Sequence, residues 1–296
     1  MTDINEYIPS SWENVNCPFC DTNKRKVHER FGHKMQFTYV ECNNCSLIYS
    51  SPRPTYNKEF IDRAYSTYYQ FAEDLKLESF TQVNESSIPM FKAELDYISQ
   101  FDKDKTATLD IGSGMGTYLY AAQKVYPLCV GIDVSVQMGN FIEQNLGIKV
   151  YNVQFENFEY PTGFSLIHMS HVIEHVPNPN EWVCKAKELL TANGILVVNV
   201  PHKHSISNRM QYLFYKLKIK KRVSSGWSDP SRTPDHLYEP TINSMKYLFN
   251  KNGFEILDYF TYSRRDPASN KNLLSKLLNR VLYFGTNLSF IVKVKN

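Results

Sequence analysis

The residues of this chain whose types and spacing best suit chemistry are a carboxylate and three glycines. An apolar run from Thr108 ends in Asp110, and Gly112, Gly114 and Gly116 follow at alternate positions. Because glycine lets a backbone turn tightly and approach a ligand closely, a strand, a glycine turn and a helix indicate a nucleotide-binding unit. A pyrophosphate fingerprint has the spacing G-x-G-x-x-G, whereas this one is G-x-G-x-G. The acid before the first glycine would repel a phosphate and suits a cationic ligand.

A second acid follows at a spacing typical of a ribose contact. The run Leu128–Asp133 predicts another strand, and its last residue lies 23 positions after Asp110. An acid about 20 residues past the glycine turn, at the end of the next strand, holds a ribose diol in nucleotide-binding folds. The alternative is that Asp133 only caps a helix that should begin near Val136.

These two stretches together resemble the class I S-adenosylmethionine (SAM) methyltransferases, whose first motif is an acidic residue followed by GxGxG. SAM carries a sulfonium and an ammonium but no phosphate, so it is a cationic ligand. The resemblance implies that Asp110 and the glycine turn hold the methionine end of SAM and that Asp133 holds its ribose.

The same resemblance implies an adenine contact after the third expected strand. The family has an acid there, which holds the adenine amino group beside a backbone N–H, and here Gln154 takes that place, or Glu156 if the alignment slips. A Gln amide oxygen can accept from the same amino group. The cofactor residues that we expect are Asp110, Gly112, Ser113, Gly114, Gly116, Asp133, Gln154, Phe155 and Ser170.

Two Cys-x2-Cys pairs predict a metal site near the N-terminus. Cys17 and Cys20 form the first pair, and 21 residues separate it from the second, Cys42 and Cys45. This spacing fits a zinc ribbon, in which each pair offers two thiolates to one side of a tetrahedral ion. Four thiolates leave no open position, so the Zn²⁺ should be structural. A disulfide framework does not suit a cytoplasmic enzyme of this size.

Histidines follow the fourth expected strand. The stretch Met169–Pro179 reads MSHVIEHVPNP and resembles the hVLEHV-x-DP motif of the same methyltransferases. Ligands of open α/β sheets lie beyond the carboxyl ends of the strands, which places His171 and His175 near the site. A histidine can take the proton from an attacking hydroxyl, so both are candidate general bases. The alternative is that Glu174 and His175 only brace the turn.

A third candidate base is His236. The segment 235–244 resembles the family's H-L-x-x-x-(T/S)-x-x-S-L segment, which lies over the substrate pocket in relatives and implies substrate-side roles for His236 and Tyr238. His202 and His204 follow the fifth expected strand and are further candidates, although we expect His204 to face solvent.

The elements that must position these residues begin near residue 106, where apolar runs alternate with helical patterns and predict a parallel sheet. A closing pair at 254–262 and 288–293 resembles the antiparallel strands that finish the same fold. We therefore expect an α/β fold, a Rossmann-like class I methyltransferase sheet with helices on both faces, plus a small N-terminal zinc ribbon. The other expected strands are 107–111, 128–133, 148–153, 165–170 and 194–200, with ribbon strands at 27–30 and 37–41.

Helix ends can also be predicted. The clearest helix is expected at 180–190, with Gly194 as its C-terminal stop. Thr241 or Asn243 should cap a helix over 244–251.

The domain organisation that we expect has three parts. Residues 1–50 form the ribbon, 51–105 a stiff connector and a helical lid, and 106–296 the SAM-binding domain with an inserted basic helix at about 203–234. In the lid, the tyrosines at positions 65, 68 and 69 suit either packing at a domain interface or ligand contact.

The inserted segment is basic and amphipathic. The stretch 203–222 holds seven basic residues and no acid, and Met210, Leu213, Phe214 and Leu217 share one helix face. We expect this stripe to pack on the domain as a lid. The same pattern suits an anionic membrane surface, or phosphates of a nucleotide sugar or RNA. A leucine pattern at 273–281 is also expected to pack.

Composition limits the functional classes. Hydrophobic residues at 42% and charged residues at 21% are ordinary for a soluble globular protein, and a net charge of +3 is too small to imply a nucleic-acid partner. No apolar run approaches the ~18–20 residues of a membrane span, and the N-terminus lacks a signal-peptide pattern. We expect a cytoplasmic enzyme, with peripheral membrane contact through the basic helix as a second possibility.

The expected reaction is an SN2 transfer of the SAM methyl group to a sugar hydroxyl, on a nucleotide sugar or a surface glycan, with a histidine base. The ribbon followed by Ser51–Thr55 resembles the N-terminal part of bacterial methyltransferases encoded with sugar-modifying enzymes. Alternatives are methylation of a sugar carbon and an RNA methyltransferase that grips phosphates with the ribbon and the basic helix. Acids within the ribbon, at positions 21, 29 and 41, disfavour RNA. The acceptor, the methylated position and the oligomeric state are left open.

Overall fold

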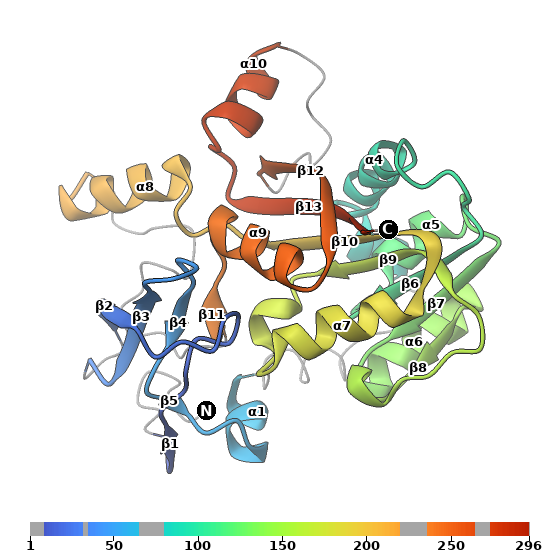
Figure 1. The fold of residues 1–296 in the computed structure, drawn as a ribbon. Coiled ribbons are helices and arrows are strands. Elements are labelled where there is room, and N and C mark those ends of the chain that lie inside the picture. Colours follow the sequence, from blue (N-terminus) through green and yellow to red (C-terminus); the bar gives the residue numbers. More distant parts are fainter. Residues whose placement is uncertain (1–8, 32–34, 65–79, 220–235, 264–272, 296) are drawn as a thin grey trace.

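A seven-stranded mixed sheet forms the centre of the molecule (Figure 1). The computed structural model describes residues 9–31, 35–64, 80–219, 236–263 and 273–295. The strand order is β12-β13-β10-β9-β6-β7-β8; the five strands from β10 to β8 are parallel, and β13 is antiparallel to both neighbours. The strands are β6 (Ala107–Ile111), β7 (Leu128–Ile132), β8 (Lys149–Tyr151), β9 (Phe164–Ser170), β10 (Leu190–Pro201), β12 (Phe254–Tyr262) and β13 (Asn287–Val294).

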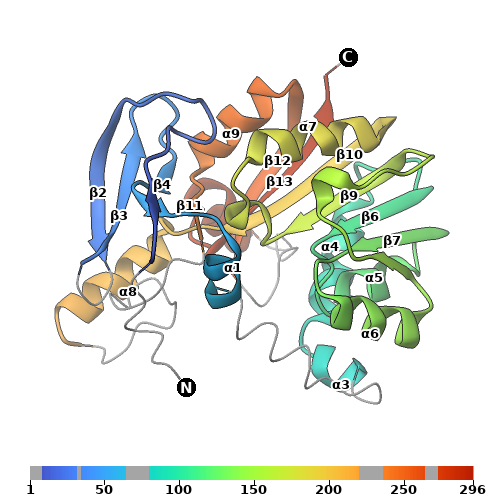
Figure 2. The same ribbon diagram turned by 90° about the horizontal axis from the view of Figure 1, so that it is seen from below.

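Helices cover both faces of this sheet (Figure 2). Helices α4, α5 and α6 lie on one face, and α7 and α9 lie on the other. Every residue of β6 is buried, as expected of a parallel strand enclosed by helices on both sides. The Rossmann-like α/β sheet that the sequence predicts is therefore confirmed. The helices are α4 (Ile88–Ile98), α5 (Thr117–Ala122), α6 (Val136–Leu146), α7 (Pro179–Leu189) and α9 (Ile242–Lys251).

The N-terminal segment forms a second, four-stranded sheet with the order β11-β4-β3-β2. Three of its strands, β2 (Arg25–Phe31), β3 (Phe37–Cys42) and β4 (Ile48–Ser50), come from the cysteine-bearing segment. The fourth, β11 (Tyr238–Glu239), comes from the far end of the chain and pairs antiparallel with β4. The two expected ribbon strands are present, and the participation of β11 goes beyond the prediction.

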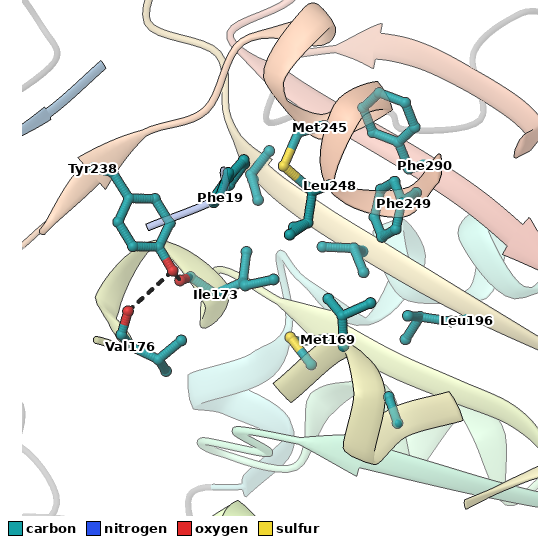
Figure 3. Close-up of a cluster of buried hydrophobic side chains, with 14 of the residues drawn as sticks. Phe19, Met169, Ile173, Val176, Leu196, Tyr238, Met245, Leu248, Phe249 and Phe290 are labelled. Atoms are coloured by element: carbon teal, nitrogen blue, oxygen red, sulfur yellow. Dashed lines mark hydrogen bonds between the residues drawn. The ribbon is translucent and has the colours of Figure 1, made fainter. Parts of the chain in front are cut away.

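One hydrophobic core joins this small sheet to the main one. Phe19 packs edge-on against Tyr238 at a centroid distance of 5.4 Å, and both belong to the same buried cluster as Met169, Leu248 and residues of β13 (Figure 3). The hydroxyl of Tyr238 donates to the carbonyl of Val176 at 3.0 Å. The N-terminal sheet is therefore packed as a continuation of the core on the α7–α9 face.

The connector after β4 is extended, as its prolines predict. Strand β5 (Arg53–Pro54) pairs with β1 (Trp12–Glu13), and the short helices α1 (Lys58–Ala64) and α3 (Phe80–Asn84) follow. The three tyrosines at 65, 68 and 69 lie outside the described residues.

The predicted N-cap of α9 is confirmed, whereas the predicted C-terminal end of α7 is wrong. Thr241 caps α9 with a reciprocal pair of hydrogen bonds to Ser244. Gly194 does not end α7, because that helix already ends at Leu189 and Gly194 lies inside β10. A Cβ on Gly194 would lie 2.7 Å from the carbonyl oxygen of Phe164, so the glycine permits close strand packing instead.

The amphipathic helix α8 (Ile206–Lys216) extends away from the main sheet (Figure 1), which corrects the expectation that its stripe packs on the domain. Met210, Leu213 and Leu217 are 42%, 52% and 58% exposed. Periodicity predicts that a helix has an apolar face but not what covers that face. Leu274 and Val281, in and after α10 (Leu273–Lys276), are likewise exposed. The rest of the inserted segment, 220–235, lies outside the described residues.

None of the helices in the described part of the chain is long and apolar enough to cross a membrane.

Candidate functional site

The glycine turn between β6 and α5 has the backbone that its sequence requires. Gly112, Gly114 and Gly116 have φ values of 72°, 50° and 74°, in the left-handed region that favours glycine. A Cβ on Gly112 would lie 2.4 Å from Cγ2 of Val172, closer than two carbon atoms can pack. Glycine is therefore required at position 112 by the close packing of the turn against Val172.

A cavity of about 740 Å³ opens beside this turn, at the carboxyl ends of β6, β9 and β10. Its walls also include α4, the first turns of α8 and the residues just before β13. This volume suits a cofactor-sized ligand. The predicted site residues that line it are Asp110, Gly112, Ser113, Ser170 and His171.

The floor of the cavity is a buried charged network that the sequence analysis did not predict. Register places Asp110 and His168 side by side on β6 and β9, and their Oδ1 and Nδ1 atoms are 2.7 Å apart. Glu94 of α4 approaches the other ring nitrogen at 3.7 Å and accepts a hydrogen bond from Asn199 at 2.6 Å. The ring of Tyr118 stacks on His168, with centroids 3.9 Å apart.

These contacts determine the charge of the floor. Burial alone would lower the pKa of His168, but the hydrogen bonds and charges of Asp110 and Glu94 outweigh burial and raise that pKa to about 9. Two carboxylates therefore share one imidazolium. A floor of this charge suits a cationic ligand better than a phosphate. The sequence signal that could have revealed this network is His168, a histidine within a mainly apolar strand, which strand register places beside Asp110.

Asp133 is tied to the glycine turn. Its Oδ2 accepts from the backbone N–H of Gly114 at 2.8 Å, and its Oδ1 accepts from that of Ser135 at 2.9 Å. Ser135 itself caps α6, so the helix-capping alternative for Asp133 is not needed. Asp133 is buried and does not line the cavity described above.

The predicted adenine residues lie in a short 3₁₀ turn, Phe155–Asn157, after β8. Gln154 is exposed, whereas the side chain of Phe155 is buried against Trp182 at a centroid distance of 5.0 Å. Neither lines the cavity, nor do Gly114 and Gly116. The ring of Phe155 is thus packed in the core and is not exposed to a ligand.

Among the predicted bases, His171 faces the cavity. It has a positive φ of 56°, its backbone N–H donates to the carbonyl of Asn199 at 2.9 Å, and its side chain is 44% exposed. Its Nδ1 lies 3.4 Å from Oε1 of the fully buried Glu174. Burial alone would raise the pKa of Glu174, but the surrounding histidines lower it to about 2. Glu174 is therefore an anion that orients His171.

The two other predicted bases, His175 and His236, contact each other. The rings of His175 and His236 are T-shaped with centroids 4.8 Å apart, because the residues that lead into β11 bring His236 to the 3₁₀ turn Ile173–His175. Nδ1 of His236 lies 3.3 Å from Oε1 of the buried Glu239. The sequence analysis missed Glu239, whose only signal was its position three residues after a candidate base.

His202 and His204 lie outside the cavity lining. Burial lowers the pKa of His202 to about 4, and its Nδ1 lies 3.2 Å from the carbonyl oxygen of Gly285. His204 does not simply face solvent, because its ring packs against His28 at 5.2 Å and burial lowers its pKa to about 3.

The four predicted metal ligands converge at one point. The Sγ atoms of Cys17 and Cys45 are 3.4 Å apart, those of Cys20 and Cys42 are 3.5 Å apart, and all four lie within 4.8 Å of one another. The backbone N–H groups of residues 44 and 45 point at Sγ of Cys42 at 3.3 and 3.5 Å. Such donors stabilise a thiolate that binds a metal, so this set of ligands fits a tetrahedral Zn²⁺.

More than half of the chain matches a known protein family. A family model described as a methyltransferase domain matches residues 88–259, which is more than half of the chain. No curated protein matches the chain in a sequence comparison.

Solved structures share the fold. A complex of Haloferax volcanii between a methyltransferase and its activator gives a TM-score of 0.51 at 11% identity, covering 77% of this chain and 98% of that chain. A SAM-dependent methyltransferase of Clostridium acetobutylicum gives 0.47 at 12% identity, covering 80% and 97%. One of Thermotoga maritima gives 0.49 at 17% identity, covering 78% and 100%. At 11% identity the likeness to the Haloferax volcanii complex concerns the fold alone.

Proposed function

Because the chain belongs to the methyltransferase-domain family and is a SAM-dependent methyltransferase, we propose that it methylates a sugar hydroxyl on a nucleotide sugar or a glycan. The observation that carries this proposal is the lining of the cavity. Beyond its charged floor, the wall offers neutral polar groups, among them Ser170, Asn208, Gln211 and Asn287. Such groups hydrogen-bond a polyhydroxylated acceptor.

The residues of the cavity fit SAM. The anionic floor suits its two cationic groups, and open space lies where a Cβ on Gly114 would stand. Asp110 with the turn would hold the methionine end, Asp133 the ribose, and Gln154 with the backbone of Phe155 the adenine. When bound, SAM supplies an electrophilic methyl group on a positively charged sulfur.

The base that we propose is His171. It is the predicted base that lines the cavity, and Glu174 beside Nδ1 leaves Nε2 free to take a proton from the acceptor hydroxyl. The remainder of the catalysis would be alignment of the acceptor oxygen with the methyl carbon.

Replacement of His171 tests this role. His171→Ala should lower kcat by about 10²–10⁴-fold while SAM binding is retained, because the lost group acts on the acceptor proton. Measured rates and SAM affinities of wild type and variant check the expectation. An unchanged rate would transfer the role to His175 or His236.

A second candidate function is RNA methylation. It is favoured by α8, on which the exposed Arg209 lies beside the apolar stripe. Against it, none of the described residues that line the cavity is Lys or Arg, so phosphates would have to be gripped elsewhere. The exposed stripe on α8 suits an anionic membrane surface equally well, which is where a glycan acceptor on a lipid carrier would lie.

Methyl-label transfer decides between these acceptors. The protein is incubated with labelled SAM and an extract of its own source, and RNA, nucleotide-sugar, glycan and lipid fractions are then separated. We expect the label in a sugar-containing fraction. A labelled methyl group on oxygen is released by ether cleavage, whereas one on carbon is retained, and we expect release. Label in RNA would overturn the sugar proposal.

A further inference from the structure

A second cluster of metal-ligating side chains lies outside the cysteine site. Ligand atoms of Glu174, His175 and His236 lie within 4.8 Å of one another. Zinc bonds of about 2.0–2.2 Å place neighbouring ligand atoms roughly 3–4 Å apart, so small side-chain rotations would close the set around one ion. We propose that these three residues form a binding site for a divalent transition-metal ion such as Zn²⁺.

The first support is the state of Glu174. Its side chain is fully buried, and among the described residues neither of its oxygens has a well-directed hydrogen bond. The ring nitrogens nearest to it are those of His171 at 3.4 Å and His175 at 4.0 Å. A buried carboxylate without hydrogen bonds costs several kcal/mol unless a cation compensates it, and a metal ion between the histidines does so.

The second support is the environment of His236. Its Nδ1 lies 3.3 Å from Oε1 of Glu239, and its backbone carbonyl accepts from the hydroxyl of Tyr39 at 3.0 Å. A carboxylate on one ring nitrogen orients the other toward a metal, as in carboxylate–histidine–zinc triads. Glu239 has no exposed surface, so the arrangement is built into the fold.

The third support is how the tertiary structure assembles the set. Figure 3 shows Tyr238 of β11 against Ile173 and Val176, the residues on either side of Glu174 and His175. Pairing of β11 with β4 thus holds His236 opposite a rigid 3₁₀ turn. Two histidines and one carboxylate leave open coordination positions, as in catalytic rather than structural sites.

Glu174 contacts His171, which lines the cavity, so the cluster adjoins the cavity through this pair. An ion here would bind an oxygen of the acceptor beside the proposed base. This use of the site rests on the proposed function, whereas binding of the ion does not.

The test measures metal binding without turnover. The full-length protein, with Zn²⁺ in its cysteine site, is titrated with Co²⁺ and followed by absorption and by metal analysis. We expect about one additional equivalent with weak d–d bands and no thiolate-to-cobalt charge transfer. His236→Ala should weaken this binding by more than tenfold, and Glu239→Gln by about 10–100-fold.

The control is His28→Ala, since His28 is a partly exposed histidine of β2 outside the cluster, and it should leave the extra equivalent unchanged. Glu174→Gln is a further variant, used only if circular dichroism shows that it folds. Absence of the extra equivalent, or wild-type Co²⁺ affinity in His236→Ala, would overturn the proposal. Loss of methyl transfer alone would not, because the readout is independent of SAM and acceptor.

Discussion

Individual residues at and around the glycine turn hold the chain in shape, and we propose that they also bind the ligand. Asp133 ties the glycine turn to the start of α6 through two backbone N–H groups, and its predicted ribose contact adds to that structural role. His168 bridges Asp110 and Glu94 beneath the cavity. Substitution of either residue therefore affects stability as well as binding, and a matched control must separate the two.

Asp133→Ala should weaken SAM binding by about 10–100-fold, the equivalent of losing charge-assisted hydrogen bonds of ~1.5–3 kcal/mol. The control is Asp102→Ala, because Asp102 is also buried and accepts from backbone N–H groups of residues 104 and 105 at 3.1 Å, but these hydrogen bonds lie before β6 and not at the glycine turn. Calorimetric titration with SAM checks both. Equal SAM affinities of Asp133→Ala and Asp102→Ala would contradict a ribose contact of Asp133.

The stability that His168 contributes should depend on pH. Its pKa is raised from 6.5 to about 9 in the folded protein, so the contribution is fully present below about pH 6.5 and is lost as the pH rises through 9. A shift of this size corresponds to a few kcal/mol, at about 1.4 kcal/mol per pKa unit. Urea unfolding of wild type and His168→Gln should differ at pH 6 and converge near pH 10. A constant difference would contradict a charged His168.

At the scale of elements, strand β11 links the two halves of the site. It completes the cysteine-bearing sheet and also carries His236 to the turn that holds Glu174. Backbone pairing with β4 and the contact of Phe19 with Tyr238 keep it there. The N-terminal sheet thus supports the cluster of Glu174, His175 and His236, and its loss should be felt there.

Cys42→Ser should remove about one equivalent of zinc and lower the melting temperature, because a structural zinc site contributes its binding energy to folding. Since β4 anchors β11, turnover should fall more than SAM affinity does. Cys184→Ser, at an exposed single cysteine, is the control and should retain the zinc. Metal analysis, thermal unfolding and kinetics check the three outcomes; unaltered zinc content in Cys42→Ser would exclude the ribbon site.

At the scale of the whole molecule, one core runs from the ribbon to the face of the main sheet that α7 and α9 cover. We propose that the chain has three parts with separate functions: the ribbon at 1–50, the connector and lid at 51–105, and the SAM-binding domain at 106–296. Energetically, the shared core and the shared sheet should make the ribbon and the domain one cooperative unit.

Unfolding should therefore occur in a single step. In urea, the reactivity of the ribbon thiols and the far-ultraviolet circular dichroism of the main sheet should have the same midpoint, because residues such as Phe19 and Met169 share one cluster. Thiol labelling with and without a zinc chelator accompanies the measurement. An early thiol transition that leaves the dichroism unchanged would show that the ribbon unfolds on its own.

The sequence by itself determined the features that depend on neighbouring residues. The glycine turn, the strands around Asp110 and Asp133, the cap at Thr241 and the cysteine pairs are local patterns, because turn, strand and chelate geometry limit which residues fit. The strand order and both closing strands agree with the fold that these motifs predict.

Only the tertiary structure decided which distant residues meet. The ion pair of Asp110 with His168 depends on strand register, and the cluster of Glu174 with His236 depends on the pairing of β11, from the far end of the chain, with β4. The exposure of the apolar stripe on α8 was likewise not predictable from the sequence, because periodicity predicts an apolar face but not what covers that face. Contacts between residues far apart in the chain follow from packing of the whole molecule, which no local pattern contains.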